Sequence, residues 1–170
     1  SYARLHRKFS FRGMLERQAD KTEVVVTFLA LLELMKIGKI HLTQEHVEIL
    51  FGKGYALTPL KDLSQPGQYA CKEMVTVCGP KGAIEKVRIL GPVRRETQVE
   101  ILAGDGFKLG VKAPVRLSGD LDGTPGITLV GPKGSVQTEK GVMVAQRHIH
   151  MLPADAERFG VHDGQVVDLE

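Results

Sequence analysis

The sequence has no tryptophan, few aromatic residues and only two cysteines, and these shortages exclude several kinds of protein. Cys71 and Cys78 are too few to hold together a small disulfide-linked fold, and they lack the neighbouring ligands of a zinc knuckle. We interpret them as reduced thiols, with a role as zinc ligands as the second choice. A chain of 170 residues is long enough to bury a hydrophobic core, so we expect a folded domain that needs no crosslinks.

Long hydrophobic runs are also lacking. The longest one, residues 24–35, is interrupted by Thr27 and Glu33 and is too short to cross a bilayer. The first residues do not show the pattern of a signal peptide. We therefore expect a cytoplasmic protein that does not act on a membrane.

The positive charge of the chain is concentrated near its beginning. Residues 1–21 contain six basic and two acidic side chains, a net charge of +4, whereas the whole chain carries +3. A basic segment can contact nucleic acid or an acidic partner. A solvated helix face explains such a segment more often, about three times in four, so we do not expect nucleic acid to be the partner.

Two short patterns occur twice in the chain. Gly79-Pro80-Lys81-Gly82 returns as Gly131-Pro132-Lys133-Gly134, each time after a run typical of a strand. Ile40-His41, with Phe51-Gly52 after it, returns as Ile149-His150 with Phe159-Gly160 after it. The repetition indicates two related units in one chain.

The chain changes character near residue 40. Before it, Asp20 and Glu23 form a capping-box pattern ahead of a helix predicted over about residues 22–37, and a shorter helix is predicted over residues 10–17. After it, short β-branched runs alternate with glycine-rich turns, as in a barrel or sandwich. The predicted strands are residues 74–78, 86–90, 98–102, 113–117, 127–130, 141–145 and 166–169.

Two short helices are predicted among these strands. Thr43 is the N-cap of one that ends at Phe51-Gly52, and Pro153 opens another that ends at Phe159-Gly160. We therefore predict a mainly β fold. It consists of two related small β-barrel units with short helices, over residues 40–102 and 103–170, preceded by an α-helical segment over residues 1–39.

Paired histidines are the main chemical signal. His148 and His150 are two residues apart on a predicted strand, so both imidazoles would point to one face and could bind one metal ion. A polar strand face would also explain them, and this motif alone gives a metal about one chance in three. The repeat favours the metal, because His41 stands where His150 does. In the first copy, however, Lys39 takes the place of the first histidine.

Three further residues are candidates for the same site. Glu100 lies on a predicted strand, and facing inward it would need a metal or an arginine, whereas facing outward it would simply be solvated. Arg94 follows a Gly-Pro turn and could hold a phosphate or a carboxylate, although a surface arginine is the usual case. Ser118 opens a glycine-rich loop whose N–H groups could bind an anion, and a plain turn explains this composition almost as well.

Long strings within residues 40–170 match a known family. They include Leu63-Ser64-Gln65-Pro66-Gly67-Gln68, Thr97-Gln98-Val99-Glu100 and Arg147-His148-Ile149-His150. On these strings the chain resembles the PduL-type phosphotransacylases, the phosphate propanoyltransferases of propanediol utilisation. The resemblance implies two β-barrels with a two-zinc site at their interface.

The resemblance also implies a reaction and its residues. An acyl-coenzyme A and phosphate would give an acyl phosphate and coenzyme A, reversibly. His41 and Glu100 would bind one zinc ion, and His148 and His150 the other. Arg94 would hold the phosphate. We also expect Ser118 to contact the substrate or coenzyme A.

The chain also departs from the family pattern. The family's first barrel opens with a strand ending in Asn-Arg-His-x-His; we expect that strand to be missing here, with Lys39 where its first histidine belongs. The family also continues through further strands with another zinc-ligating histidine, so each zinc site is expected to be one ligand short. Residues 1–39 resemble instead the C-terminal region of segregation and condensation protein A, the bacterial kleisin. We interpret the chain as a chimera with its seam near Lys39-Ile40.

Two functions follow from these patterns. The first is a zinc-dependent phosphate acyltransferase for propanoyl-coenzyme A or a similar short chain, with impaired activity. The alternative is a non-catalytic scaffold whose kleisin-like helix docks on a condensin ATPase head. Two further possibilities are left undecided. The apolar helix could mediate a homodimer, and the protein could reside in a bacterial microcompartment, although no encapsulation peptide is evident.

Overall fold

A computed structural model of the chain describes residues 38–63, 65–150 and 152–168. The chain divides between His148 and Ile149 into two compact units, each of which is considered by itself. The two helices predicted before residue 38 lie outside the described residues. Among the residues described, no helix is both long enough and apolar enough to span a membrane.

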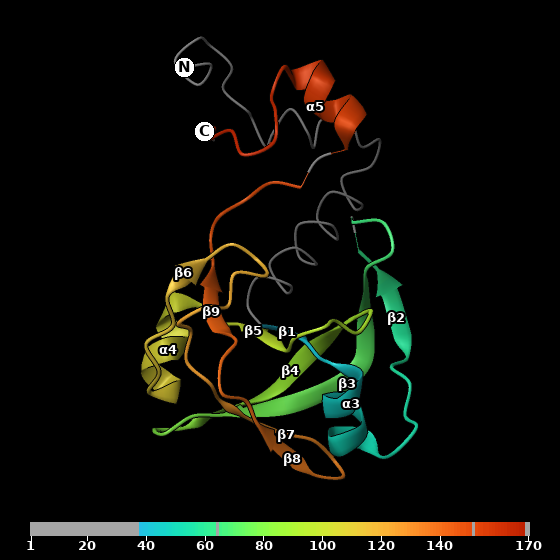
Figure 1. Ribbon diagram of the computed structural model, residues 1–170, viewed down its shortest axis with the longest axis vertical. Helices are drawn as coiled ribbons and strands as arrows, with labels where there is room; N and C mark the ends of the chain where they lie inside the picture. Colours follow the sequence, from blue (N-terminus) through green and yellow to red (C-terminus); the bar gives the residue numbers. More distant parts are fainter. Residues whose placement is uncertain (1–37, 64, 151, 169–170) are drawn as a thin grey trace, which may run out of the picture. The chain divides into compact units, whose positions relative to one another are not determined.

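One curled, half-barrel sheet forms the body of the larger unit (Figure 1). The strands run in the order β6-β9-β5-β1-β4-β3-β7-β8, with β2 paired to β3 outside this path. The fold is therefore mainly β, as predicted. The strands are β1 (Lys39–His41), β2 (Pro59–Asp62), β3 (Tyr69–Cys78), β4 (Ala83–Gly91), β5 (Gln98–Glu100), β6 (Val115–Arg116), β7 (Thr128–Val130), β8 (Ser135–Gln137) and β9 (Val142–Ala145).

Strands from both predicted barrel units belong to this sheet. Strand β5 pairs in parallel with β9, and β3 pairs in antiparallel with β7. The division into two barrel units over residues 40–102 and 103–170 stays a prediction.

The first predicted short helix, α3 (Gln44–Phe51), has the ends that the sequence indicates. The Thr43 side chain accepts a hydrogen bond from the backbone N–H of His46, and Gly52 is the C-cap. This satisfies one of the N–H groups that a helix start leaves without a partner. In the smaller unit, α5 (Pro153–Phe159) begins at the predicted proline and ends at Gly160 in the left-handed conformation.

A further helix, α4 (Ala103–Leu109), was not predicted. The preceding strand was predicted to reach Leu102, but β5 ends at Glu100 and Leu102 is the N-cap of α4. The Leu102 N–H donates to the Asp105 carboxylate at 3.2 Å, which favours a helix start despite the nearby glycines.

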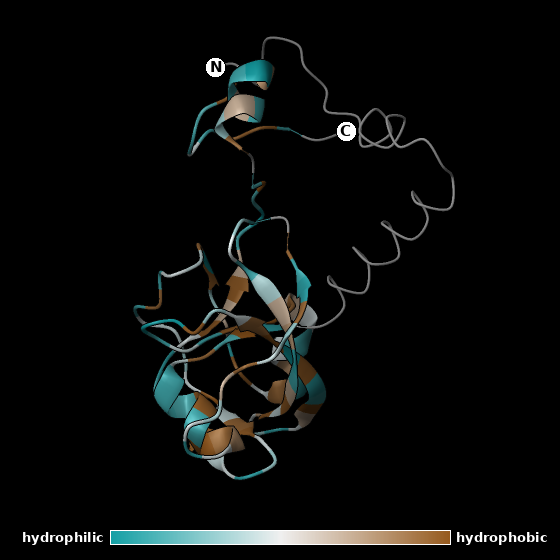
Figure 2. Cartoon of the chain, turned by 90° about the vertical axis from the view of Figure 1, so that its right-hand side faces the viewer, coloured by the Kyte–Doolittle hydropathy of each residue, from teal (hydrophilic) through white to brown (hydrophobic). Residues whose placement is uncertain are grey.

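Alternation along the strands separates the core from the opposite face of the sheet. Ile40 of β1 lies in register with Ile89 of β4 and Val99 of β5, and Val99 lies in register with Val142 of β9. All four side chains are buried. Burial of each stabilises the fold by about 1.5–3 kcal/mol. Figure 2 shows hydrophobic residues along the strands in the body of the sheet.

The repeated Gly-Pro-Lys-Gly segments form the same structure twice. Residues 79–82 join β3 to β4, and residues 131–134 join β7 to β8. The N–H of Lys81 donates to the carbonyl of Leu109 in α4, and the N–H of Lys133 donates to the carbonyl of Leu50 in α3. Each turn thus covers carbonyls that a helix C-terminus leaves without an intrahelical partner.

Six of the seven predicted strands are present: β3 and β4 are longer than predicted, and β5, β6, β7 and β9 are shorter. The exception is residues 166–169, because residues 166–168 form no strand. Strands β1, β2 and β8 were not predicted. In particular, the expectation that the first strand is missing is wrong for residues 39–41, which form β1 between β4 and β5.

A glycine-to-alanine exchange tests the contact between turn and helix. A Cβ atom at Gly131 would lie 2.6 Å from the Leu50 carbonyl oxygen, so Gly131→Ala must push the turn off α3. We expect a loss of about 1–3 kcal/mol in the free energy of unfolding, measured by urea denaturation. Gly104→Ala in α4 is the matched control, because its Cβ would meet no atom within 4 Å. Equal stability of the two variants would contradict this contact.

A buried carboxylate ties the segment after α3 to strand β3. Glu73 accepts hydrogen bonds from the Tyr55 hydroxyl at 2.9 Å and from the Thr58 N–H at 3.1 Å. Desolvation by itself would raise the pKa of Glu73, but these hydrogen bonds outweigh it, and the net pKa is lowered from the ordinary 4.5. The charged form of Glu73 is therefore favoured in the folded protein.

This gives a pH-dependent prediction. A carboxylate with a lowered folded-state pKa stabilises the protein above its unfolded-state pKa and loses that effect as pH falls through the folded-state value. We expect Glu73→Gln to lower the free energy of unfolding by about 2 kcal/mol at pH 7. The difference from the parent should shrink below pH 4.5. Glu85→Gln, at an exposed position of β4, is the control, and a pH-independent difference would refute the prediction.

Candidate active site

The pairing of β1 with β5 brings four polar side chains together on one face of the sheet. Lys39 lies opposite Glu100, and His41 lies opposite Gln98, in an antiparallel register. Residues opposite each other in such a pair point to the same face. This face is the reverse of the one that carries Ile40 and Val99 into the core.

His41 is the least ordinary of these residues. It is 3 % exposed, and its Nδ1 atom is buried with no hydrogen-bond partner among the described residues. Burial lowers the pKa of His41 to about 3, with contributions from the positive charges of Arg94 and Lys39. At neutral pH the imidazole is therefore neutral.

Gln98 connects several of the candidate residues. Its Nε2 donates to Glu100 Oε1 at 2.6 Å and to Ser118 Oγ at 2.9 Å. Its Oε1 accepts from the backbone N–H of Gly119 at 2.8 Å. The loop that begins at Ser118 is thereby attached to strand β5.

Arg94 reaches the same group of side chains from the segment after β4. Its backbone N–H donates to the Leu42 carbonyl at 2.8 Å, and its Nη1 donates to Ser118 Oγ at 3.2 Å. Burial lowers the pKa of Arg94, and the negative charge of Glu100 opposes this effect. The structure therefore brings together four of the predicted site residues, His41, Arg94, Glu100 and Ser118. These four residues and Gln98 are called the polar cluster below.

The two remaining candidates lie outside β9. Strand β9 ends at Ala145, so the prediction that His148 and His150 lie on a strand is wrong. Both side chains are exposed, and His148 Nδ1 lies 2.6 Å from the Gln146 carbonyl oxygen. His148 is the last residue of the larger unit, and His150 belongs to the smaller one.

Part of the polar cluster fits a metal ion. A metal binds a neutral imidazole through a free lone pair, and His41 is neutral with an unpartnered buried nitrogen. Glu100 places a carboxylate on the same face. Within the described part of the chain, however, no three His, Cys, Asp or Glu side chains gather closely enough to hold an ion.

Gln98 is the member of the cluster that sequence analysis did not select. A lone glutamine in a strand pattern carries no signal of its role. Its alternation with Glu100, two residues on, was the available hint, because both side chains point to one face.

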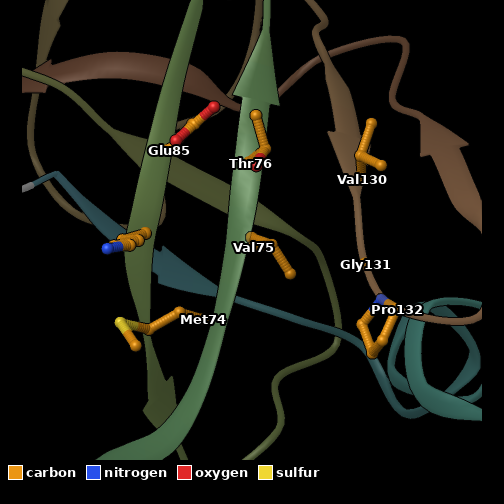
Figure 3. A pocket seen from close by; sticks show the side chains of 8 residues that line it. Met74, Val75, Thr76, Glu85, Val130, Gly131 and Pro132 are labelled. Carbon is orange, nitrogen blue, oxygen red and sulfur yellow. The ribbon is translucent and has the colours of Figure 1, made fainter.

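A separate groove lies over β3, β4 and β7 (Figure 3). Its volume is about 400 Å³, and its lining includes Met74, Glu85, Lys86 and Val130. None of the candidate residues from the sequence analysis line it, so it is not the site described above.

Comparisons with known proteins link most of this chain to one enzyme family. A family model described as phosphate propanoyltransferase matches residues 37–170. Among curated relatives, the phosphate propanoyltransferase of Thermotoga maritima is 64% identical over 128 residues, which cover 75% of this chain and 61% of the relative. That of Clostridioides difficile is 57% identical over 140 residues, 82% of this chain and 67% of the relative.

The relatives are longer than this chain. That of Listeria monocytogenes is 56% identical over 131 residues, 77% of this chain and 62% of the relative. The chain thus spans about three fifths of the length of the relatives from Thermotoga maritima and Listeria monocytogenes. A second family model, described as segregation and condensation protein ScpA, matches residues 2–49.

The unpartnered nitrogen of His41 gives a stability prediction. A buried polar atom without a partner costs about 1–3 kcal/mol, so His41→Leu should raise the free energy of unfolding by about 1 kcal/mol. Urea denaturation in buffer with a chelator measures this. His46→Leu is the matched control and should not be stabilising, because His46 Nδ1 lies 2.7 Å from Thr97 Oγ1. Destabilisation by His41→Leu would show that the imidazole has a structural role.

Proposed function

Because the chain belongs to the phosphate propanoyltransferase family, we propose that it transfers an acyl group from coenzyme A to phosphate, reversibly. The substrate is propanoyl-coenzyme A or a similar short-chain thioester. The observation that carries the proposal is the polar cluster, in which a neutral buried imidazole, an arginine, a carboxylate and a hydroxyl meet on one face of the sheet. A guanidinium can bind a phosphate anion, and a neutral imidazole and a carboxylate can bind a metal ion.

Arg94 and Ser118 are the residues that would hold phosphate. A guanidinium binds two oxygens of a phosphate at once, and partial burial strengthens that interaction. The Nη1–Oγ hydrogen bond at 3.2 Å keeps the two side chains adjacent. A phosphate held there would be oriented so that one oxygen attacks the thioester carbonyl carbon, after which the carbon–sulfur bond breaks and coenzyme A leaves as a thiolate.

His41 and Glu100 would hold one zinc ion, and His148 and His150 a second. The unpartnered nitrogen of His41 supports the first assignment, and the spacing of the two exposed histidines supports the second. When bound, zinc supplies a Lewis acid that polarises the thioester carbonyl and stabilises the thiolate.

We further propose that Lys39 impairs the first zinc site. Lys39 stands where the second copy of the repeat has His148, and it lies opposite Glu100. A lysine adds a positive charge beside a cation and removes one imidazole ligand. The loss of a supporting partner alone costs about 10–100-fold in metal affinity or activity.

The duplication is part of the same proposal. Residues 40–102 and 103–170 would be diverged copies of one barrel-forming unit, supported by the two equivalent turn-and-helix contacts. The chain would act in the cytoplasm or in a bacterial microcompartment.

The alternative is a scaffold function. The match of residues 2–49 to the ScpA model is the observation that favours it. The kleisin-like segment would then dock on a condensin ATPase head, and co-purification with that ATPase would be the expected result. The polar cluster has no purpose in this alternative, so we favour the transferase.

The transferase proposal predicts a gain of function at one position. We expect slow phosphate-dependent thiol release from propanoyl-coenzyme A by this chain, and an increase of about tenfold or more with Lys39→His. Metal analysis should show more bound zinc in the same variant. The control is Lys61→His, at an exposed position of β2. No thiol release by either the parent or Lys39→His would refute the proposed reaction.

A further inference from the structure

Gln98 makes more side-chain hydrogen bonds than any other described member of the polar cluster. It is 2 % exposed, and its amide makes three hydrogen bonds, to Glu100, Ser118 and Gly119. Both amide hydrogens are donated, and the carbonyl oxygen accepts one hydrogen bond. Three hydrogen bonds to three different groups hold this buried amide rigidly.

Only one orientation of this amide is acceptable. The Nε2 group faces a carboxylate oxygen, which accepts hydrogen bonds, and Oε1 faces a backbone N–H, which donates one. A flipped amide would place oxygen against the Glu100 carboxylate and N–H₂ against the Gly119 N–H. The neighbours of Gln98 therefore determine that it donates to Ser118.

This determines what Ser118 can do. A hydroxyl oxygen accepts two hydrogen bonds and donates one. Ser118 Oγ already accepts from Gln98 Nε2 at 2.9 Å and from Arg94 Nη1 at 3.2 Å. Its remaining capacity is its own O–H, which can only donate.

We propose that Gln98 is a positioning residue that makes Ser118 a committed hydrogen-bond donor, so that Ser118 and Arg94 together form a donor-only subsite for phosphate. Such a subsite favours an anion that needs no proton to bind, and it disfavours a neutral ligand with its own donors. Gln98 itself does not touch the phosphate. The inference rests on the proposed function for the identity of the anion.

Binding of inorganic phosphate, measured by calorimetry without a thioester, tests the inference. We expect Gln98→Met to weaken phosphate binding about tenfold, because Ser118 regains a free lone pair and loses its fixed orientation. Gln137→Met, at an exposed position of β8, is the matched control and should bind as the parent does. Thermal unfolding of each variant checks that the fold is retained.

A second variant keeps the inference testable if Gln98→Met does not fold. Ser118 is exposed, so Ser118→Ala should fold normally and should also weaken phosphate binding about tenfold. Unchanged binding by Ser118→Ala overturns the inference. Where both variants fold, their double mutant should bind no more weakly than either single one, because Gln98 acts through Ser118.

The remaining outcomes separate this inference from the proposed function. Additive losses in the double mutant would mean that Gln98 acts independently of Ser118, against the inference. Phosphate binding with the expected pattern but without thiol release would support the subsite and refute the transferase. If the parent binds no phosphate at all, the subsite does not exist and the inference is wrong.

Discussion

The antiparallel pairing of β1 with β5 is the constraint on which the candidate site depends. Strand β1 has only three residues, and its register places Lys39 and His41 opposite Glu100 and Gln98. A shift by one residue would turn Ile40 out of the core and carry both polar side chains into it. Ile40 also lies beside Ile89 and Val99 in the core, so the packing of the core determines the register of β1. The register in turn determines where the residues of the site lie.

The parts of the fold that sequence analysis predicted have strong local signals. Thr43 and Gly52 mark the ends of α3, and Pro153 and Gly160 mark those of α5. Strand β1 has no comparable signal, because three residues make no periodic pattern and its partners are distant in sequence. Helix α4 was missed because its local signal is misleading. Its glycines indicate a loop, and the hydrogen bond from the Leu102 N–H to the Asp105 carboxylate is known only from the structure.

For the site, the types of residue were easier to predict than their environment. Histidine, arginine and carboxylate chemistry drew attention to His41, Arg94 and Glu100, which the structure brings together. The sequence could not reveal that burial leaves the His41 imidazole neutral, because this depends on packing from several elements. Nor could it reveal the role of Gln98, whose importance lies in which atoms its amide faces.

The contacts of the two Gly-Pro-Lys-Gly turns with helices α4 and α3 have a consequence for folding. The turn at residues 79–82 lies on α4, a moderate distance along the chain, whereas the turn at residues 131–134 must return to α3, near the beginning of the described residues. Contacts between distant residues close late and slow the search for the native state. A ribosome would therefore have to release most of the chain before α3 could contact the turn at residues 131–134. Until then, the carbonyl groups at the end of α3 would need hydrogen bonds from water or from other groups.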